Sequence, residues 1–343
     1  GFARHDMQSV LKDCTYLLPV RRAAFDPAEA EGLRRYFEEL VAAGCELLVI
    51  DGSPDDVFAQ HDRLWSGVCR HERVDRQHGY LNDKVNGVHT GVALASHEKV
   101  ILADDDIRYS AANVRETCAL LETFDVVRPQ NYLRPLPWWA RMEAARMLIN
   151  RATLRTADYP GTCAFRRTTM LGVGHYDGDV LFDNEEIIRH FASSGASICH
   201  ANNLFVQKRP PSFRKWREQR PRQAYEDFPL RTKTAIFFLI PFLLLGAALI
   251  GKFLATLLAV VLISIALAFV GRARGDAAKF FPASIPFHAP LWIFERSFST
   301  YAALYWLVRR GGYPFGDQLL TKGVGRDWFA GRMRGHPERS AAK

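Results

Sequence analysis

The sequence predicts an α/β domain with a mostly parallel sheet, followed by apolar helices near the C-terminus. Strand-like and helix-like segments alternate at short spacing between residues 16 and 128, which is the pattern of a parallel sheet covered on both faces. Two apolar runs, at residues 235–251 and 253–270, contain no Asp, Glu, Lys or Arg, and Lys252 alone separates them. A purely soluble protein is therefore not expected.

The composition is that of a folded protein with a basic surface. The 343 residues are 48% apolar and 24% charged, which excludes a disordered, collagen-like or disulfide-scaffold protein. The net charge is +8, and basic residues gather on both sides of the apolar runs. They are Arg214, Lys215, Arg217, Arg220, Arg222, Arg231, Lys233, Arg272, Arg274 and Lys279. A membrane surface is therefore the expected partner, and nucleic acid is not.

The cysteines predict neither a metal site nor a redox pair. The six are widely spaced and form no CxxC sequence. Apolar neighbours, as in VAAGCELLVI, predict buried free thiols in a reducing compartment.

The first strand is predicted at residues 16–20, a short apolar run. Residues 27–43 have the period of a helix, because their large apolar side chains fall on one face. These are Leu33, Tyr36, Phe37, Leu40 and Val41, and Gly44 follows as a cap. Residues 46–50 (ELLVI) predict a second strand, and the Asp-Gly-Ser-Pro that follows predicts a turn.

The same alternation continues along the chain. Residues 84–96 predict a helix, and residues 100–103 predict a strand that ends at Asp104-Asp105-Asp106. Residues 113–122 are helical in pattern, and residues 125–128 are strand-like. Ligands of such sheets bind beyond the carboxyl ends of the strands, so the polar groups after ELLVI and VILA are where a ligand is expected.

Residues 129–150 interrupt this pattern, because they are rich in Pro and Trp before becoming helical. Trp138 and Trp139 fit two interpretations equally well. They are either part of the core or anchors at a lipid interface, where indole rings favour the headgroup level.

The two apolar runs are each close to the shortest length that spans a bilayer, about 17 residues. As one helix they would overshoot it, so we expect a hairpin that turns near Gly251-Lys252. Basic residues at both outer ends place both ends in the cytoplasm. A third apolar segment, residues 287–308, is interrupted by Glu295 and Arg296. It is expected to form an amphipathic helix lying in the interface, with a third span as the alternative.

Asp104-Asp105-Asp106 is the strongest candidate for a metal site. Adjacent carboxylates at a strand end repel one another unless a cation or hydrogen-bond donors neutralise them. Oxygen ligands of this kind suit Mg²⁺ or Mn²⁺, especially when a diphosphate completes the coordination shell. The alternative is a solvated acidic turn.

Several segments, in order along the chain, resemble family 2 glycosyltransferases of the GT-A fold. Residues 17–20 (LLPV) resemble the opening strand, and residues 46–56 (ELLVIDGSPDD) resemble the second strand with its Asp-Gly-Ser turn. Lys84 and residues 86–106 are similar to the Lys–Asn–Gly helix that leads into the DXD motif.

The resemblance continues toward the apolar runs. Residues 161–177 (GTCAFRRTTMLGVGHYD) are similar to the acceptor-side segment, and residues 219–222 resemble the start of QxxRW. It covers about residues 14–230 and extends weakly through residues 310–316. The implied fold is a GT-A domain, Rossmann-like with a mostly parallel sheet, followed by transmembrane and interfacial helices.

The resemblance also implies roles for individual residues. The nucleotide-sugar would be bound by Pro19, Asp51, Lys84, Asp104 and Asp105. The metal, Mn²⁺ or Mg²⁺, would be held by Asp104, Asp106 and His200, although a structural role for His200 after the strand-like ASIC is the stronger alternative. The acceptor or the diphosphate would be bound by Gln219, Arg220 and Arg222, whose alternative role is binding lipid headgroups. A metal that bridges both phosphates stabilises the charge developing on the leaving nucleoside diphosphate.

The chain departs from the family pattern at three places. Arg21-Arg22-Ala23 replaces an Asn and an acidic residue after the opening strand, and Gln223 replaces the Trp of QxxRW. The third departure concerns the general base of inverting members, because the Glu-Asp pair falls on Asp183-Asn184, and an amide accepts no proton at neutral pH. Two interpretations remain open. Either Asp183, Glu185 or Glu186 is the base, or an anionic acceptor makes a base unnecessary, as in polyprenyl-phosphate sugar synthases, whose Phe-Asp-x-Glu segment is similar to FDNEE.

The sequence therefore predicts a membrane-bound, metal-dependent glycosyltransferase that inverts the configuration of the sugar and uses a UDP-, GDP- or dTDP-linked donor. The acceptor would be a lipid or a polyprenyl phosphate. Residues 1–230 would form the catalytic domain, residues 231–272 the transmembrane hairpin, and residues 273–343 the interfacial helix and basic tail. The expected location is the inner cell membrane, multi-pass, with the catalytic domain cytoplasmic. Alternatives are a polysaccharide synthase-like transferase, a sugar nucleotidyltransferase and a non-catalytic membrane scaffold.

Overall fold

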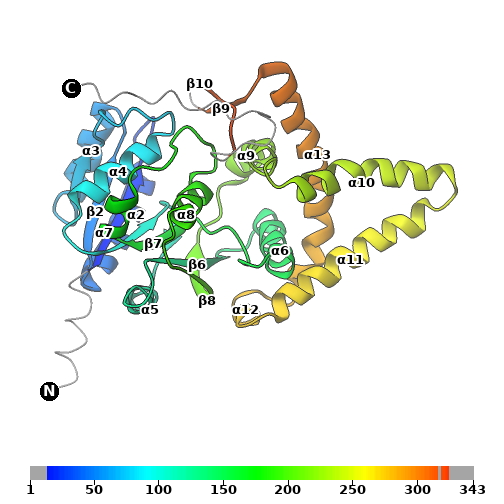
Figure 1. Ribbon diagram of the computed structural model, residues 1–343, viewed down its shortest axis with the longest axis horizontal. Coiled ribbons are helices and arrows are strands. Elements are labelled where there is room, and N and C mark those ends of the chain that lie inside the picture. The colour runs from blue at the N-terminus through cyan, green and yellow to red at the C-terminus, as the bar shows by residue number, and fades with distance from the viewer. Residues whose placement is uncertain (1–13, 316–317, 324–343) are drawn as a thin grey trace.

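The computed structural model describes residues 14–315 and 318–323, and its main feature is an eight-stranded sheet with the strand order β3-β2-β1-β4-β7-β6-β8-β5 (Figure 1). The strands are β1 (Cys14–Val20), β2 (Glu46–Asp51), β3 (Arg70–Arg73), β4 (Lys99–Ala103), β5 (Ile107–Arg108), β6 (Val126–Leu133), β7 (Thr162–Arg166) and β8 (Ile198–Lys208). The basic tail predicted beyond residue 323 lies outside the described residues.

The sheet is mostly parallel, as predicted. β1 pairs in parallel with β2 and β4, β2 with β3, and β6 with β8. The exceptions are β7, which is antiparallel to β4 and β6, and β5, which is antiparallel to β8. β7 lies between β4 and β6, so the sheet joins strands that are far apart in the sequence. The α/β class is therefore confirmed.

Helices cover both faces of the sheet, which is also as predicted. They are α2 (Pro27–Ala42), α3 (Asp55–Trp65), α4 (Asp83–Leu94), α5 (Ala111–Leu120), α7 (Arg167–Val173) and α8 (Asp183–Ser193). Alternate side chains of β1 point to opposite faces: Tyr16 and Leu18 pack into the core with α2, α3 and α5. Leu17 packs into the core with α4, α7 and α8. The strand expected at residues 125–128 is longer in the structure, because β6 continues to Leu133.

The remaining helices form a second body beside the sheet (Figure 1). They are α6 (Trp138–Thr153), α9 (Phe213–Glu226), α10 (Arg231–Leu249), α11 (Phe253–Ala273), α12 (Ala277–Phe280) and α13 (Ala289–Tyr305). A third core, with Leu148, Trp216, Phe237, Ala268 and Trp292, joins these helices to one another. A short antiparallel pair, β9 (Tyr313–Phe315) and β10 (Gln318–Leu320), follows.

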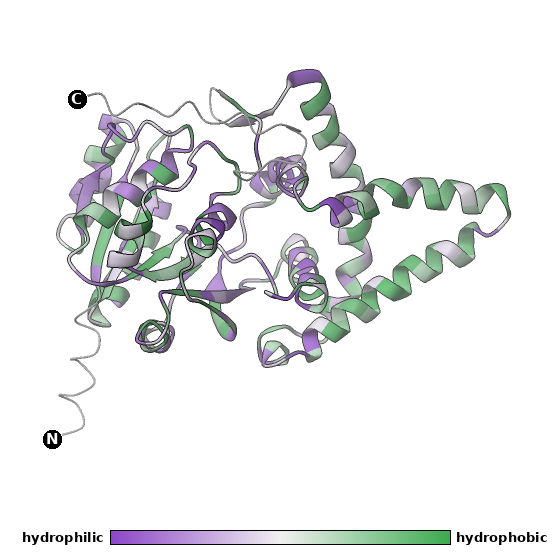
Figure 2. Ribbon diagram, viewed as in Figure 1, coloured by the Kyte–Doolittle hydropathy of each residue, from purple (hydrophilic) through white to green (hydrophobic). Residues whose placement is uncertain are grey.

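α10 and α11 form a hairpin that projects away from the α/β domain, and its hydropathy is high along both helices (Figure 2). The turn lies where it was predicted, because α10 ends at Leu249, Gly251 has a φ of 70°, and α11 begins at Phe253. Near the tip, Leu249 is 81% exposed and Leu254 is 77% exposed. By length and composition, these are the two described helices that are long and apolar enough to cross a membrane.

α13 runs across the base of this hairpin (Figure 1). Its inner face buries Trp292 and Arg296, and its outer face exposes Leu291 and Phe298. The helix is therefore amphipathic, as predicted, and it packs against α6, α9, α10 and α11. It is not among the helices whose length and composition fit a span.

The two tryptophans at the start of α6 have different environments. Trp139 packs against the third core and donates a hydrogen bond from Nε1 to the Pro211 carbonyl oxygen over 2.9 Å. Trp138 is 51% exposed and contacts Trp139, Phe213 and Trp216. The first is thus part of the core, and the second presents an open aromatic face.

The contact between α6 and α11 makes a testable prediction about the hairpin. A Cβ on Gly271 of α11 would overlap the backbone carbonyl of Leu148 in α6, so Gly271→Ala forces the two helices apart. We expect it to lower the free energy of unfolding by about 1–3 kcal/mol, which is typical of overpacking. Thermal unfolding of the detergent-solubilised protein measures this loss.

Gly246→Ala in α10 is the matched control, because a Cβ there meets no atom within 4 Å. Replacing a helical glycine by alanine at an open site should be neutral or slightly stabilising. Equal losses for the two variants would contradict the close approach of α6 and α11.

Candidate functional site

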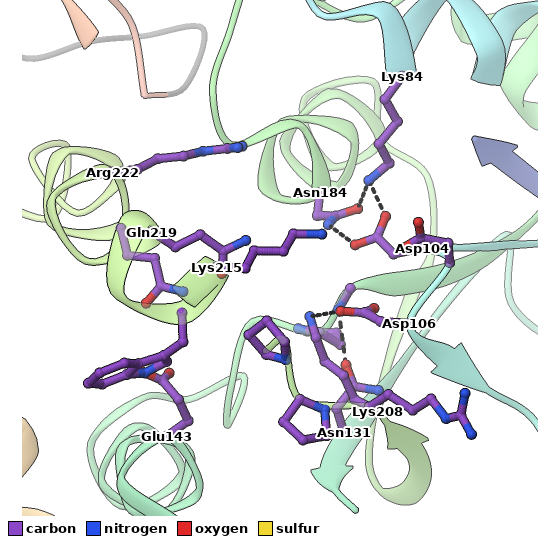
Figure 3. Close-up of a pocket in the computed structure, with 18 of the residues that line it drawn as sticks. Lys84, Asp104, Asp106, Asn131, Glu143, Asn184, Lys208, Lys215, Gln219 and Arg222 are labelled. Carbon is purple, nitrogen blue, oxygen red and sulfur yellow. Dashed lines mark hydrogen bonds and ion pairs between the residues drawn. The ribbon is translucent and has the colours of Figure 1, made fainter. Parts of the chain in front are cut away.

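A cleft of about 900 Å³ lies beyond the carboxyl ends of β1 and β4 and extends to the base of the hairpin. At one end it is lined by Pro19, Lys84 and the three consecutive aspartates. At the other end it is lined by side chains of α6, α9, α10 and α13. Figure 3 shows the middle of the cleft, where Lys215 and Arg222 extend from α9 toward Asp104.

Lys84 connects three elements at the sheet end of the cleft. It lies in the first turn of α4, where the Asn82 side chain caps the helix by accepting a hydrogen bond from the Lys84 backbone N–H. Its Nζ lies 2.5 Å from Asp104 Oδ1, at the end of β4, and 2.7 Å from Asp183 Oδ2, at the start of α8. Although burial alone would lower the pKa of Lys84, the two carboxylates raise it, so the ammonium stays charged.

Asn184 completes this arrangement with both ends of its amide. Its Oδ1 accepts a hydrogen bond from Lys84 Nζ over 2.8 Å, and its Nδ2 donates one to Asp104 Oδ2 over 3.1 Å. A carboxylate could do only the first of these, because it has no proton to donate. The amide therefore suits the position between a cation and a carboxylate.

The other two aspartates face different partners. Asp105 forms an ion pair with Arg22, which also binds Glu29. Asp106 Oδ2 lies 3.5 Å from Lys208 Nζ, and its Oδ1 is buried without a hydrogen-bond partner among the described residues. Burial raises the pKa of Asp106, and the charge of Lys208 offsets this only in part.

Asp104 is placed by a close backbone approach. Its N–H donates a hydrogen bond to the Gly161 carbonyl over 3.1 Å, and a Cβ on Gly161 would lie 2.8 Å from Asp104 Oδ2. Burial alone would raise the pKa of Asp104, but Lys84 and Lys208 hold it below its usual value. Asp104 is thus an ionised carboxylate at the centre of the cleft.

The far end of the cleft is strongly basic and rests on buried ion pairs. Lysine and arginine side chains from four helices line it: Arg146, Lys215, Arg220, Arg222, Lys233 and Arg296. Arg220 is ion-paired with Glu143 of α6, and Arg296 with Asp227 at the end of α9. Burial opposes ionisation of Glu143, but Arg220 and Arg146 hold its pKa at about 2.

The structure brings most of the predicted site residues into this one cleft. Those that line it are Pro19, Lys84, Asp104, Asp105, Asp106, Asp183, Gln219, Arg220 and Arg222. Asp51, Glu185, Glu186 and His200 do not line it.

Asp51 is buried in a different environment. Its side chain has no exposed surface, Oδ2 lies 2.7 Å from His61 Nδ1 and 3.1 Å from His71 Nε2, and Oδ1 accepts a hydrogen bond from the Ser53 N–H over 2.8 Å. These partners engage both oxygens of a side chain that does not line the cleft, so the structure does not bring Asp51 together with the other predicted nucleotide-binding residues. The Asp-Gly-Ser turn reads as a binding motif in the sequence, but its aspartate stabilises the β2–α3 junction.

His200 and Glu185 are also directed elsewhere. His200 pairs in register with Arg128, near the start of β8, whereas Lys208 beside Asp106 is at the end of the same strand. The length of the strand between them separates His200 from the aspartates. Glu185 is ion-paired with Arg128 over 2.6 Å. Among the described residues, no group of three His, Cys, Asp or Glu side chains is placed to hold a metal.

Sequence reasoning missed several residues that line the cleft. Lys208 ends β8 beside Asp106, and Lys215 begins the basic row of α9. Glu143, in the middle of α6, is buried as the partner of Arg220. The sequence carried one usable signal, because Lys208 follows the apolar residues 204–206 (LFV) by two positions, where a strand is expected to end.

Comparisons with known proteins give similarity only at the level of solved structures. No family model matches this chain, and no curated protein matches it. A mannosyltransferase from Pyrobaculum calidifontis in complex with GDP-Man and Mn²⁺ is 17% identical, with a TM-score of 0.48 over 84% of this chain and 87% of that one. Glucosyl-3-phosphoglycerate synthase from Mycobacterium tuberculosis, with Mn²⁺, UDP and phosphoglyceric acid, is 19% identical, with a TM-score of 0.39 over 63% of this chain and 78% of that one. At these scores the likeness does not establish a shared activity.

The cation at the centre of the cleft predicts a stability effect. Lys84→Met leaves Asp104 and Asp183 facing each other without their shared cation. We expect the free energy of unfolding to fall by about 2–3 kcal/mol, below the value for a fully buried pair because solvent reaches these side chains. Lys279→Met, which removes an exposed ion pair with Asp276, is the control and should cost little. A Lys84→Met protein as stable as this control would contradict the role of Lys84.

The buried Glu143 predicts a loss of stability in acid. Its folded-state pKa of about 2 is lower than its ordinary value of 4.5, so its contribution is present above pH 4.5 and is lost as the pH falls toward 2. The full contribution is roughly 3 kcal/mol. Denaturant unfolding of the unchanged protein between pH 3 and pH 7 should show this loss. In Glu143→Gln, the free energy of unfolding should depend less on pH over the same range. Glu72→Gln, at an exposed carboxylate, should leave the loss as it is.

Proposed function

We propose that this protein is a membrane-bound, metal-dependent glycosyltransferase that moves a sugar from a nucleotide-sugar to the phosphate of a membrane lipid. One observation carries this proposal: a single cleft joins the aspartate cluster at the sheet edge to the basic base of the apolar hairpin. Such a cleft has room for a diphosphate at one end and for a lipid phosphate at the other. The GT-A assignment and membership of glycosyltransferase family 2 belong to the same proposal.

The donor end has the chemistry that a divalent cation requires. Asp106 Oδ1 is buried and without a partner, and Asp104 is ionised beside it. Mg²⁺ and similar ions are usually held by one or two carboxylates together with substrate phosphates, so the absence of a third protein ligand among the described residues fits. Asp104 and Asp106 would hold Mn²⁺ or Mg²⁺. When bound, this metal would neutralise charge on the departing nucleoside diphosphate.

The acceptor end favours an anion over a hydroxyl. A hydroxyl acceptor needs a base to take its proton, whereas a phosphate oxygen is already ionised at neutral pH. Asn184 stands at the expected base position with its amide engaged by Lys84 and Asp104. Of the nearby carboxylates, Asp183 is held by Lys84 and Glu185 by Arg128. Lys215, Arg222 and the neighbouring cations would attract and orient a phosphate.

The proposed reaction is an in-line displacement at the anomeric carbon of the sugar. An oxygen of the lipid phosphate forms the new bond to this carbon, and the bond to the diphosphate oxygen breaks. The nucleoside diphosphate leaves with the electron pair, so the configuration inverts and no proton is transferred. Lys84 holds Asp104 and Asn184 in place throughout.

The membrane location rests on the hairpin and on α13. Lys233 of α10 and Arg296 of α13 line the cleft, so the apolar helices begin at its edge. With the hairpin inserted in a bilayer, α13 would lie along the membrane surface (Figure 1). Its exposed apolar side chains, among them Leu291 and Phe298, would be available to lipid. The basic residues around both ends of the hairpin would place the α/β domain on the cytoplasmic side of the inner membrane.

The test follows label from UDP-, GDP- and dTDP-sugars into lipid, in membranes that contain the protein and Mn²⁺. We expect a labelled, organic-extractable product that mild acid hydrolyses, because a glycosyl phosphodiester is acid-labile. Asp106→Asn should reduce the product at least 100-fold, and Asp55→Asn, at an exposed aspartate, should not reduce it. An acid-stable product would mean a hydroxyl acceptor, and the absence of any product would contradict the proposal.

The amide at position 184 gives a second prediction. Asn184→Asp puts a carboxylate 3 Å from Asp104, next to the incoming diphosphate, and provides a base that a phosphate acceptor does not use. We expect the turnover rate to fall at least tenfold, because the added charge repels both reactants. Asn113→Asp, in the cap of α5, controls for an added charge away from the cleft. A faster Asn184→Asp enzyme would indicate that a hydroxyl is the natural nucleophile.

A further inference from the structure

Asp83 is a buried carboxylate that the arrangement described so far does not use. It is the first residue of α4, beside Lys84, and lines the same cleft with only 8% of its surface exposed. Its Oδ1 accepts hydrogen bonds from Arg76 Nη1 over 2.7 Å and from Asn86 Nδ2 over 3.1 Å. Its Oδ2 is buried and accepts no hydrogen bond among the described residues. Its nearest cation is Arg21, at 3.4 Å, so the oxygen is in an ion pair but still has room for a hydrogen-bond donor from a ligand.

The free oxygen faces a narrow, apolar part of the cleft. Pro19, Val20, Ile50 and Val74 line the cleft here. A Cβ on Gly52 would overlap Asp83 Oδ2 and would lie 3.3 Å from a methyl group of Val74, so Asp83 can take this position only because residue 52 has no side chain. The result is a slot beyond the ends of β1 and β2 with apolar walls and one hydrogen-bond acceptor. A flat heterocycle with an N–H on its edge fits this chemistry.

Two guanidinium groups flank the carboxylate. Arg76 contacts Oδ1 and also donates from Nη2 to the Gly52 carbonyl over 3.1 Å. Arg21 Nη1 lies 3.4 Å from Oδ2, and its side chain is 64% exposed, so it has freedom to move. Asp83 Oδ2 is therefore an acceptor with a guanidinium group on each side, of which Arg21 lines the cleft and Arg76 lies behind it, bound to Oδ1 and Gly52.

We propose that Asp83 reads the base of the nucleotide-sugar and selects the imide edge of uracil or thymine. This edge presents a carbonyl, an N–H and a second carbonyl, of which the N–H and one carbonyl are the complement of Asp83 Oδ2 and Arg21. The inference rests on the proposed function, which requires a nucleotide donor. It assigns to Asp83 the recognition that the sequence pattern implied for Asp51, whose oxygens are occupied by His61, His71 and Ser53.

The other common bases fit this edge less well. Guanine presents two adjacent N–H donors, but Asp83 offers one free oxygen, and the second donor would face a guanidinium. Cytosine and adenine present a ring nitrogen that accepts hydrogen bonds, and a carboxylate repels it. When the wrong ligand binds, a buried polar group of the site is left without a hydrogen-bond partner. Such a site therefore discriminates strongly against that ligand.

The test measures binding of nucleoside diphosphates to the full chain in detergent with Mn²⁺, by calorimetry and without a sugar acceptor. UDP and 5-methyl-UDP should bind with similar affinity. GDP, CDP and 3-methyl-UDP, which lacks the imide N–H, should bind about 10- to 100-fold more weakly, the range expected for one hydrogen bond to a charged group. Tighter binding of GDP than of UDP would overturn the proposal.

Asp83→Asn tests the residue itself. We expect it to weaken UDP binding about 10- to 100-fold and to reduce the preference for UDP over CDP, because an amide can donate to the cytosine ring nitrogen. Asp55→Asn, at the exposed aspartate, should change neither affinity. Arg21→Gln is an exposed second variant that should weaken UDP binding by a few fold. If Asp83→Asn does not fold, the affinities of Arg21→Gln for UDP and of the unchanged protein for 3-methyl-UDP test the proposal instead.

The outcomes separate this inference from the proposed function. If no nucleoside diphosphate binds in the presence of Mn²⁺, the proposed function itself fails. If nucleoside diphosphates bind, but the Asp83→Asn protein prefers UDP over CDP as strongly as the unchanged protein does, the proposed function stands. Asp83 is then not the residue that recognises the base.

Discussion

The ammonium group of Lys84 is the interaction on which the site depends. It neutralises carboxylates from β4 and α8 while belonging to α4, so it holds together three elements that are far apart in the sequence. Carboxylates this close and this buried repel one another strongly without a cation between them. Lys84 also binds the Asn184 amide, so this one side chain contacts Asp104, which it and Lys208 keep ionised, and the residue beside it.

Much of the fold follows from local pattern. The strand at residues 46–50 and the helix at residues 27–43 were predictable because their apolar spacing matches the period of each structure. The hairpin turn was predictable because Gly251 and Lys252 interrupt an otherwise apolar stretch. The position of β7 between β4 and β6 was not predictable, since pairing between distant strands leaves no local signal.

The site was predicted less completely, for a related reason. Lys84 and Asp104 were found because they stand at strand ends and helix starts that pattern can locate. Asp51 occupies such a position too, but its direction depends on His61 and His71, which approach from α3 and β3. Glu143 gave no signal, because a glutamate in a helix looks like a surface residue until its buried partner is known. Motif spacing places the backbone, and tertiary contacts decide where each side chain points.

The buried ion pairs at the base of the hairpin join α10 and α13 to the end of α9. Arg296 of α13 binds Asp227, and Lys233 of α10 binds the same carboxylate over 3.0 Å. Breaking one member of such a set leaves another charge buried and unpaired, which costs several kcal/mol. The angle between the hairpin and the cleft is therefore held firmly, and a change in the hairpin reaches the cleft through these charges.

The hairpin rises from the edge of the cleft, and this has a kinetic consequence for the proposed reaction. A lipid anchored in the same bilayer searches for the cleft by diffusion in a plane, which raises its effective concentration without any further contact. The nucleotide-sugar, in contrast, would reach the cleft by diffusion through the solution. Turnover would then depend on how densely the lipid populates one leaflet.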